Sequence, residues 1–155
     1  MKKLAIFALP LLLASTVQAA ETTTIQLSAD VPSDSFHFRP ITPITGVQQF
    51  DWDLLNDKLQ PMSYDFSFNK GGANDSVTAT LANDVQLTNG ADQIPVIVSV
   101  GGVTLTTTAA NVVEESDAQT GSKTLTLTPN ATGRAAAGSY TGTVEIAFDA
   151  VLKTP

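Results

Sequence analysis

The sequence predicts an all-β fold, and three observations favour it: alternation of apolar and polar residues, frequent threonine, and short turn signals between the alternating segments. Alternation with a period of two places successive side chains on opposite faces of a strand. Threonine is a common strand residue because its branched side chain suits a pleated surface. Several short strands separated by turns, in a chain of this length, indicate an immunoglobulin-like β-sandwich.

The first 19 residues are interpreted as a signal peptide for export. Lys2 and Lys3 form a basic start, Leu4–Thr16 is apolar, and Val17-Gln18-Ala19 offers the small residues of a cleavage site. We expect cleavage after Ala19, with Ala20 as the alternative. The apolar run is too short for a membrane span, and no later stretch is long enough for one. The mature chain is then one ordinary domain without a membrane span.

The segment Glu21–Pro32, "ETTTIQLSADVP", predicts a strand at the very start of the mature chain. Its apolar face carries Ile25, Leu27, Ala29 and Val31. Pro32 has no backbone N–H to donate and so marks the end of the strand. A single strand has no independent stability, and this one has no hairpin partner beside it, so it must dock elsewhere. We therefore divide the mature chain into an extension, residues 20–32, and a domain, residues 33–155.

The alternating segments that follow predict the strands of the domain. They are Met62–Phe68, Val77–Leu81, Ile94–Val100, Val103–Thr107, a strand around Leu125 and Leu127, and a last strand, expected to be the longest, from Tyr140 to Leu152. Ile97 lies on the face opposite to Ile94, Val96, Val98 and Val100, which allows burial of that strand on both faces. Gly101-Gly102 predicts a tight hairpin turn. Asp51–Leu59 and Ala109–Asp117 could each form a short helix.

Composition narrows the classes of function. The formal net charge is −7, and removal of the two signal-peptide lysines makes it −9, which argues against nucleic acid and anionic membranes as partners. The absence of cysteine excludes thiol enzymes and disulfide scaffolds. The one histidine, His37, belongs to no catalytic motif, and no nucleotide-binding fingerprint occurs. We therefore predict neither an enzyme nor a cofactor.

Two acidic clusters and one tryptophan are the remaining candidates for a binding site. Asp51, Asp53 and Asp57 form one cluster and Glu114, Glu115 and Asp117 the other. Calcium needs about six to eight oxygen ligands, and neither spacing matches a calcium loop, so we interpret both as solvated acidic loops. Trp52, near Phe50, could stack on a sugar, but a tryptophan in the core is the favoured interpretation.

Three segments resemble a known family when they are taken in order: "TIQLSADVP" near the start, "QIPVIVSVGGVTLTTTA" in the middle and "AGSYTGTVEIAF" near the end. Together they resemble the major pilin subunits of the colonisation-factor (α-type) fimbriae, which use the alternate chaperone–usher pathway. The match covers roughly a third of the mature chain. Pro32–Gln60, with "FHFRPITPITG" and "DWDLL", departs from what the family leads us to expect.

The resemblance implies an incomplete immunoglobulin-like sandwich that lacks one strand and is completed by donor-strand exchange. A periplasmic chaperone would lend a strand first, and the N-terminal strand of the next copy would replace it. The donor residues would be Ile25, Leu27, Ala29 and Val31. One wall of the acceptor groove, on the strand that pairs with the chaperone, would carry Val144, Ile146, Phe148, Ala150 and Leu152.

The implied function is that of a structural subunit of a surface fimbria that supports adhesion and colonisation. Its partners would be further copies of itself, the chaperone, an outer-membrane usher and a tip adhesin. It would be exported through the periplasm to the cell surface. The alternative is a minor or tip subunit, or a free secreted sandwich domain, that binds a host glycan or protein.

Overall fold

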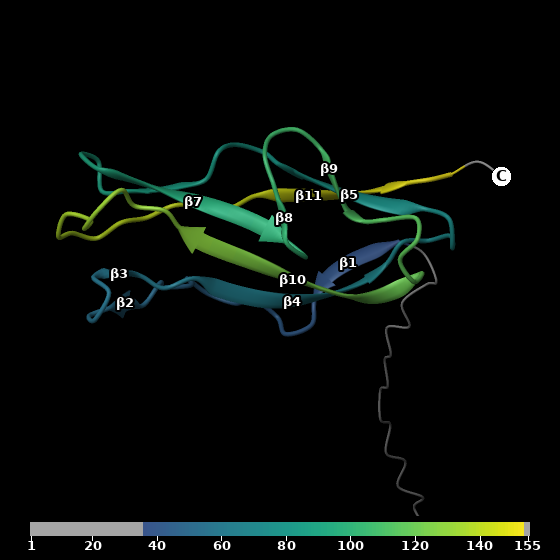
Figure 1. Ribbon diagram of the computed structural model, residues 1–155, viewed down its shortest axis with the longest axis horizontal. Coiled ribbons are helices and arrows are strands. Elements are labelled where there is room, and N and C mark those ends of the chain that lie inside the picture. The colour runs from purple at the N-terminus through teal and green to yellow at the C-terminus, as the bar shows by residue number, and fades with distance from the viewer. Residues whose placement is uncertain (1–35, 154–155) are drawn as a thin grey trace, which may run out of the picture. The chain divides into compact units, whose positions relative to one another are not determined.

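Two antiparallel sheets pack face to face in the computed structural model of this chain, which describes residues 36–153 (Figure 1). The larger sheet contains, in spatial order, β1 (His37–Pro40), β4 (Met62–Asn69), β10 (Thr120–Pro129), β7 (Gln93–Val100) and β6 (Gln86–Thr88), with β8 (Val103–Thr104) also paired to β7. The smaller sheet contains β11 (Ile146–Val151), β5 (Ser76–Leu81) and β9 (Ala110–Val113). A separate hairpin consists of β2 (Trp52–Asp53) and β3 (Lys58–Leu59). The prediction of an all-β sandwich is confirmed.

The core lies between the two sheets because alternate residues of each strand face inward. Its buried members are Phe66, Phe68, Val77, Ala79, Leu81, Val85, Val96, Val98, Val100, Leu105, Val112, Val113, Leu125 and Leu127. The expectation that β7 is buried on both faces is wrong. Ile97 is 41% exposed, whereas its neighbours Val96 and Val98 are buried, so burial along this strand alternates between the two faces.

The hairpin turn predicted at Gly101-Gly102 is confirmed, but its second strand, predicted as Val103–Thr107, ends at Thr104. Val100 pairs with Val103, so two residues make the turn between β7 and β8. Gly101 has φ +56° and Gly102 has φ +85°. Positive φ at both central residues is the geometry of a tight hairpin turn, and glycine adopts it without steric cost.

The prediction of short helices at Asp51–Leu59 and Ala109–Asp117 is wrong, because both segments contain strands. In Asp51–Leu59, the Asp53 carboxylate accepts hydrogen bonds from the backbone N–H of Leu55 at 2.9 Å and of Asn56 at 3.0 Å. These bonds fold the segment into the turn between β2 and β3. In Ala109–Asp117, β9 forms because it pairs with β5 across the smaller sheet, a contact that sequence periodicity does not report.

The last strand is shorter than expected, and β10 is the longest strand of the described chain. Tyr140 precedes β11, and the next residue, Thr141, forms a bridge with Thr88 beside the larger sheet. The chain therefore crosses from one sheet to the other before β11 begins at Ile146. Leu152 lies beyond the end of β11 and is 75% exposed.

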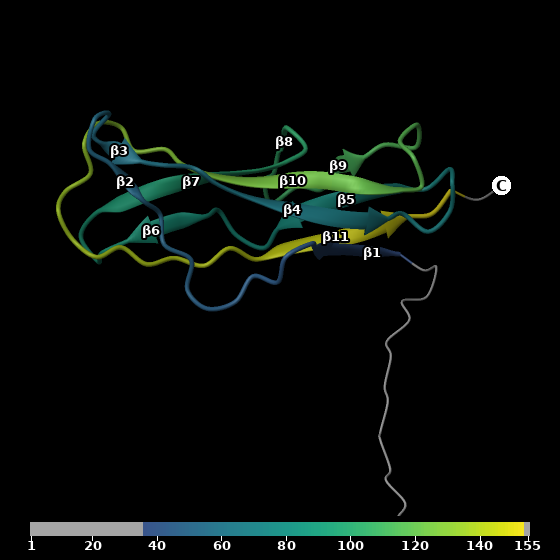
Figure 2. The same cartoon turned by 90° about the horizontal axis from the view of Figure 1, so that it is seen from below.

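The two long sides of the sandwich are built differently. On one side, the segment after β8 links the sheets, since Leu105 donates to Val98 and Leu81 donates to Thr106 through backbone hydrogen bonds. On the other side, β1 and β11 are edge strands of different sheets and run close together (Figure 2). Within residues 36–153, each of these two edges pairs with only one strand.

Buried polar groups hold the end of the sandwich where β1 starts. The Lys70 side chain is fully buried, and its Nζ donates to the backbone carbonyls of Glu115 and Asp117 at 2.7 Å and of Glu114 at 3.2 Å. Three acceptors satisfy the three donors of the ammonium group, which makes its burial tolerable. The loop after β9 is thereby fixed to the loop after β4.

Asp75, also buried, ties the C-terminal segment to the same end. Its carboxylate accepts from the backbone N–H of Lys153 at 2.9 Å and of Gly72 at 2.7 Å. These two hydrogen bonds, that from Lys153 first, lower the pKa of Asp75 below its ordinary value near 3.8. The ionised carboxylate is therefore part of the folded structure.

Candidate assembly groove

A groove opens where β1, the edge strand of the larger sheet, stops pairing with β4. Pro40 is the last residue of β1, and the backbone N–H of Ile41 still donates to Asp65. The chain then leaves the edge of β4, and Pro43 has no N–H with which to continue the pairing. Residues 42–50 run away from the sheet as a loop, so the inner faces of Tyr64 and Met62 lie beside an uncovered gap.

The groove has a volume of about 520 Å³ and is lined by both sheets and by the loop that left β4. Its lining consists of Ile44, Gly46, Val47, Gln48, Phe50, Met62, Tyr64, Phe66, Val85, Leu87, Val96, Leu125, Leu127, Gly142, Thr143, Val144, Ile146 and Phe148. None of these described residues is charged. The groove therefore suits an apolar segment rather than an ion or a polar metabolite.

One wall of the groove comes from β11 and the residues just before it. Val144, Ile146 and Phe148 line the groove and are half-buried, as alternation along the strand requires. The Phe148 ring stacks on Phe38 of β1 with 4.1 Å between the ring centroids. This stack fills the space between the sheets beyond the groove.

The other two residues expected on this wall lie farther along the chain. Ala150 is half-buried in β11 but does not line the groove, and exposed Leu152 lies past the strand. The opposite wall, with Val47 and Phe50, was not anticipated from the sequence. That loop shows no periodicity, so only the structure brings it to the groove.

The groove lies beside a free strand edge, and this combination has a defined binding chemistry. Among the described residues, β11 pairs with β5 on one side only, so within residues 36–153 its other edge offers unpaired backbone donors and acceptors. An extended segment could pair with this edge and place alternate side chains in the groove. The four expected donor residues, Ile25, Leu27, Ala29 and Val31, lie outside the described residues, as do the signal peptide and the extension 20–32.

The acidic clusters do not form a metal site in the described part of the chain, where no group of three or more potential ligands is brought together. Asp53 instead caps the β2–β3 turn. Asp117 accepts from Lys123 Nζ at 2.9 Å and from the backbone N–H of Glu114 at 3.1 Å. Both hydrogen bonds lower the pKa of Asp117, that from Lys123 first.

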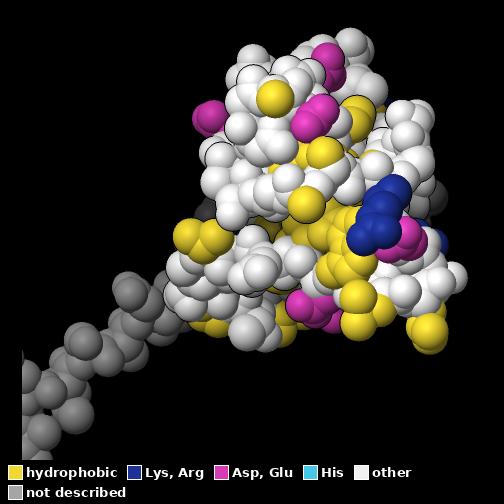
Figure 3. All heavy atoms as spheres, turned by 90° about the vertical axis from the view of Figure 1, so that its left-hand side faces the viewer, with side chains coloured by type: hydrophobic (Ala, Val, Ile, Leu, Met, Phe, Trp, Pro, Cys, Tyr) yellow, Lys and Arg dark blue, Asp and Glu magenta, His cyan; other side chains and the backbone are white. Residues whose placement is uncertain are grey.

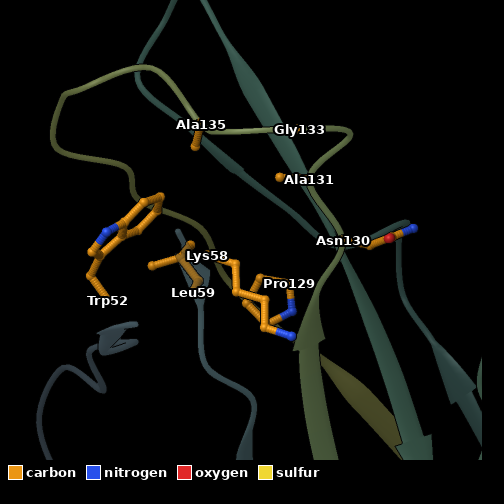
Figure 4. Close-up of a pocket in the computed structure, with 8 residues that line it drawn as sticks. All are labelled: Trp52, Lys58, Leu59, Pro129, Asn130, Ala131, Gly133 and Ala135. Carbon is orange, nitrogen blue, oxygen red and sulfur yellow. The ribbon is translucent and has the colours of Figure 1, made fainter. Parts of the chain in front are cut away.

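Trp52 is half-buried rather than a core residue, and it borders two small cavities beside the β2–β3 hairpin. One, of about 240 Å³, lies between the hairpin and residues Pro129–Ala135 that follow β10 (Figure 4). The other, of about 260 Å³, also contacts Tyr140. Both are below the roughly 300–1,000 Å³ of ordinary small-molecule sites, so neither supports a glycan site.

Comparison with known proteins identifies the family. The sequence pattern of the CS1 type fimbrial major subunits matches residues 21–149. The chain belongs to this family. No protein of curated function matches the sequence of this fimbrial subunit.

One solved structure supports the assigned fold. The fimbrial subunit is similar to the CooA pilin subunit from enterotoxigenic Escherichia coli, with a TM-score of 0.56 and 21% identity, over 67% of this chain and 78% of that one. The resemblance to colonisation-factor pilins that the sequence suggested is confirmed. The protein is a structural subunit of a fimbria, and its family implies a place at the cell surface. The described residues of the subunit include no helix able to span a membrane.

Proposed function

We propose that copies of this subunit polymerise by donor-strand exchange, in which Thr22–Val31 of one copy fills the groove of the next. The observation that carries the proposal is an uncharged groove of about 520 Å³ beside the free edge of β11. The family match begins at Glu21 and so includes the proposed donor segment. The donor strand would occupy the space beside β4 that the loop 42–50 leaves uncovered.

The length of the donor fits the groove. Ile25 and Val31 are six residues apart, which corresponds to about 20 Å in an extended strand. Gly142 and Phe148, the first and last lining residues on the β11 side, are also six residues apart. Four donor side chains on one face can therefore be set along the whole wall.

The expected binding energy is large compared with the stability of a domain. Burial of Ile25, Leu27 and Val31 would contribute about 1.5–3 kcal/mol each, and Ala29 less. Hydrogen bonds to the β11 edge would add about 1 kcal/mol apiece. A small domain has a free energy of unfolding of about 5–15 kcal/mol, so donor and acceptor would separate only with difficulty.

The same features explain why assembly would need helper proteins. A free edge next to an open apolar groove favours aggregation, so a subunit in transit would need a temporary cover. A periplasmic chaperone would supply it by pairing with β11, and an outer-membrane usher would exchange it for the next donor strand. The first copy would attach to a tip adhesin. The proposed role is structural, and we assign no catalytic residue, cofactor or metal.

The donor strand is tested by Leu27→Asp, which places a charge on its apolar face. This variant, like deletion of Thr22–Asp30, should still form a soluble complex with the chaperone, because its own groove is intact. Electron microscopy should find no long fibres. The matched control is Gln26→Asp on the polar face of the same strand, which should still form fibres. Long fibres built only from the Leu27→Asp subunit would contradict the proposal.

The groove is tested by Val144→Asp, which should donate its own strand but accept none. Mixed with Leu27→Asp, which should accept but not donate, it should stop assembly at a two-subunit complex. Size-exclusion chromatography of the mixture, with each variant alone as a control, measures this. Longer oligomers in the mixture would show that Val144 does not line the docking site.

A further inference from the structure

Two leucines project from the turn between β2 and β3 without a partner in the described chain. Leu54 is 86% exposed and Leu55 is 95% exposed. The hydrogen bonds to Asp53 fix the turn that holds them outward. We call Leu54 and Leu55 the leucine tip. Figure 3 views this end of the domain and shows hydrophobic side chains gathered across its face, which is a common mark of an interaction surface.

The leucine tip lies at the end of the sandwich opposite to the start of β1. β4 runs from one end to the other: Met62 pairs with Leu127, next to the hairpin, whereas Asn69 pairs with His37 at the start of β1. The C-terminal segment lies at the β1 end too, because Lys153 is bonded to Asp75 there. Figure 1 shows the hairpin and the C-terminal end of β11 at opposite ends of the sandwich.

The length of the chain outside the described domain restricts how far apart two neighbours can be. If Val31 ends the docked donor strand and Phe36 begins the donor's own domain, only residues 32–35 lie between them. Even fully extended, this link covers no more than about 18 Å. The link therefore keeps the two domains close together, and a direct contact between the facing ends would bury the apolar residues exposed there.

The direction of the donor strand decides which ends touch. A fibre that continues indefinitely needs a heterologous contact between two different ends of the subunit. Each copy's own chain enters the domain at the β1 end. The donated strand must then finish at the leucine-tip end of the acceptor, which makes it antiparallel to β11. The β1 end of each donor consequently faces the leucine tip of its acceptor.

We propose that the leucine tip packs against the β1 end of the neighbouring copy, where Val151 and Leu152 are 47% and 75% exposed. The contact joins two apolar surfaces that are otherwise in water, and it exists once per subunit along the fibre. This inference rests on the proposed donor-strand exchange. It adds a second contact, which would set the angle between successive subunits while the donor strand sets their connection.

A directed disulfide tests the contact, because the chain has no cysteine of its own. The two-subunit complex described above has one interface, with Val144→Asp as donor and Leu27→Asp as acceptor. The forward pair places Leu152→Cys in the donor and Leu55→Cys in the acceptor. Oxidation should convert monomer bands into a dimer band on boiled, non-reducing gels, since a disulfide needs Cα atoms about 4.4–6.8 Å apart.

The reversed pair is the matched control. It places Leu55→Cys in the donor and Leu152→Cys in the acceptor, on ends that face away from each other, and should give no dimer band. A second control replaces Leu152→Cys by Thr104→Cys, an exposed position on β8 in the middle of the sandwich. Leu54→Cys and Val151→Cys form a second forward pair if the first impairs folding.

The outcomes separate this inference from the donor-strand proposal. A dimer band from a forward pair alone supports the leucine-tip contact. A two-subunit complex that forms but gives no band, or gives one with the reversed or Thr104→Cys pair, overturns the contact and leaves donor-strand exchange standing. If the complementary variants form no complex at all, donor-strand exchange fails and the leucine-tip contact fails with it.

Discussion

The two ends of the sandwich are made from the same two sheets, but residues 36–153 fill only one of them. Near the start of β1, Phe38 stacks on Phe148 between the sheets, and Lys70 and Asp75 fix the surrounding loops. Near the β2–β3 hairpin, β1 has already ended and the space between the sheets is open. The difference depends on the length of one edge strand, since β1 has only four residues against the eight of β4.

Phe148 joins the two regions, so its replacement should have the largest effect. Phe148→Asp would bury a charge between the sheets and remove the stack on Phe38. A Phe→Ala change in a core already costs about 3–5 kcal/mol, and the buried charge adds to that cost. We expect little soluble subunit in the periplasm, measured by immunoblot, even with the chaperone present. Ala147→Asp, on the exposed face of the same strand, is the control and should accumulate normally. Normal recovery of Phe148→Asp would contradict its place in the groove wall.

Replacing a valine by phenylalanine should have an intermediate effect on stability, and this effect should differ between the filled end and the open end. Val77→Phe adds a ring where the side chain is fully buried and should lower the free energy of unfolding by about 1–3 kcal/mol. Val144→Phe adds the same ring to the groove wall, where there is room, and should change the stability of the isolated subunit by less than about 0.5 kcal/mol. It should nevertheless weaken binding of a peptide with the sequence Thr22–Val31. Urea denaturation measures the change in stability, and titration with the peptide measures its binding. If Val144→Phe destabilised the subunit as much as Val77→Phe, the groove would be filled in solution.

The smallest effect expected is a change in the pH dependence of stability when Asp75 is replaced. Because the pKa of Asp75 is lowered in the folded state, its contribution to stability is complete above the unfolded value near 3.8 and is lost as the pH falls through the still lower folded value. Asp75→Asn should therefore lower the melting temperature at pH 7 but matter progressively less below about pH 4. Asp84→Asn, at an exposed position, is the control. The groove lining contains no carboxylate, so no acidic group of the groove should give donor binding this pH dependence.

The sequence predicted those features whose cause is local. Alternation identified the inner faces of β4, β5 and β7, and the paired glycines identified the β7–β8 turn, because each pattern reflects backbone geometry within a few residues. Alternation also predicted that one face of the last strand carries Val144, Ile146 and Phe148, which line the groove. The length of the last strand was overestimated, since alternation continues past the residues that find a pairing partner.

Features that depend on distant contacts could not be predicted. β9 is a strand only because β5 lies beside it, and the loop wall with Val47 and Phe50 is formed by the departure of the chain from β4. The burial of Lys70 depends on three carbonyls more than 40 residues away, so composition alone would assign this lysine to the surface. The cluster Asp51, Asp53 and Asp57 was interpreted as a solvated acidic loop, but its spacing did not reveal that Asp53 caps the β2–β3 turn.

The buried lysine also affects how the subunit withstands digestion. The loop Asn69-Lys70-Gly71-Gly72 joins two strands at an end of the domain, and such glycine-rich connections are preferred sites of proteolytic nicking. A trypsin-like protease must draw the lysine side chain into its specificity pocket before it can cut. Lys70 Nζ is instead held by three backbone carbonyls and is out of reach of solvent. The contact that fixes two loops together thus also removes a cleavage site from the surface of a protein that is displayed outside the cell.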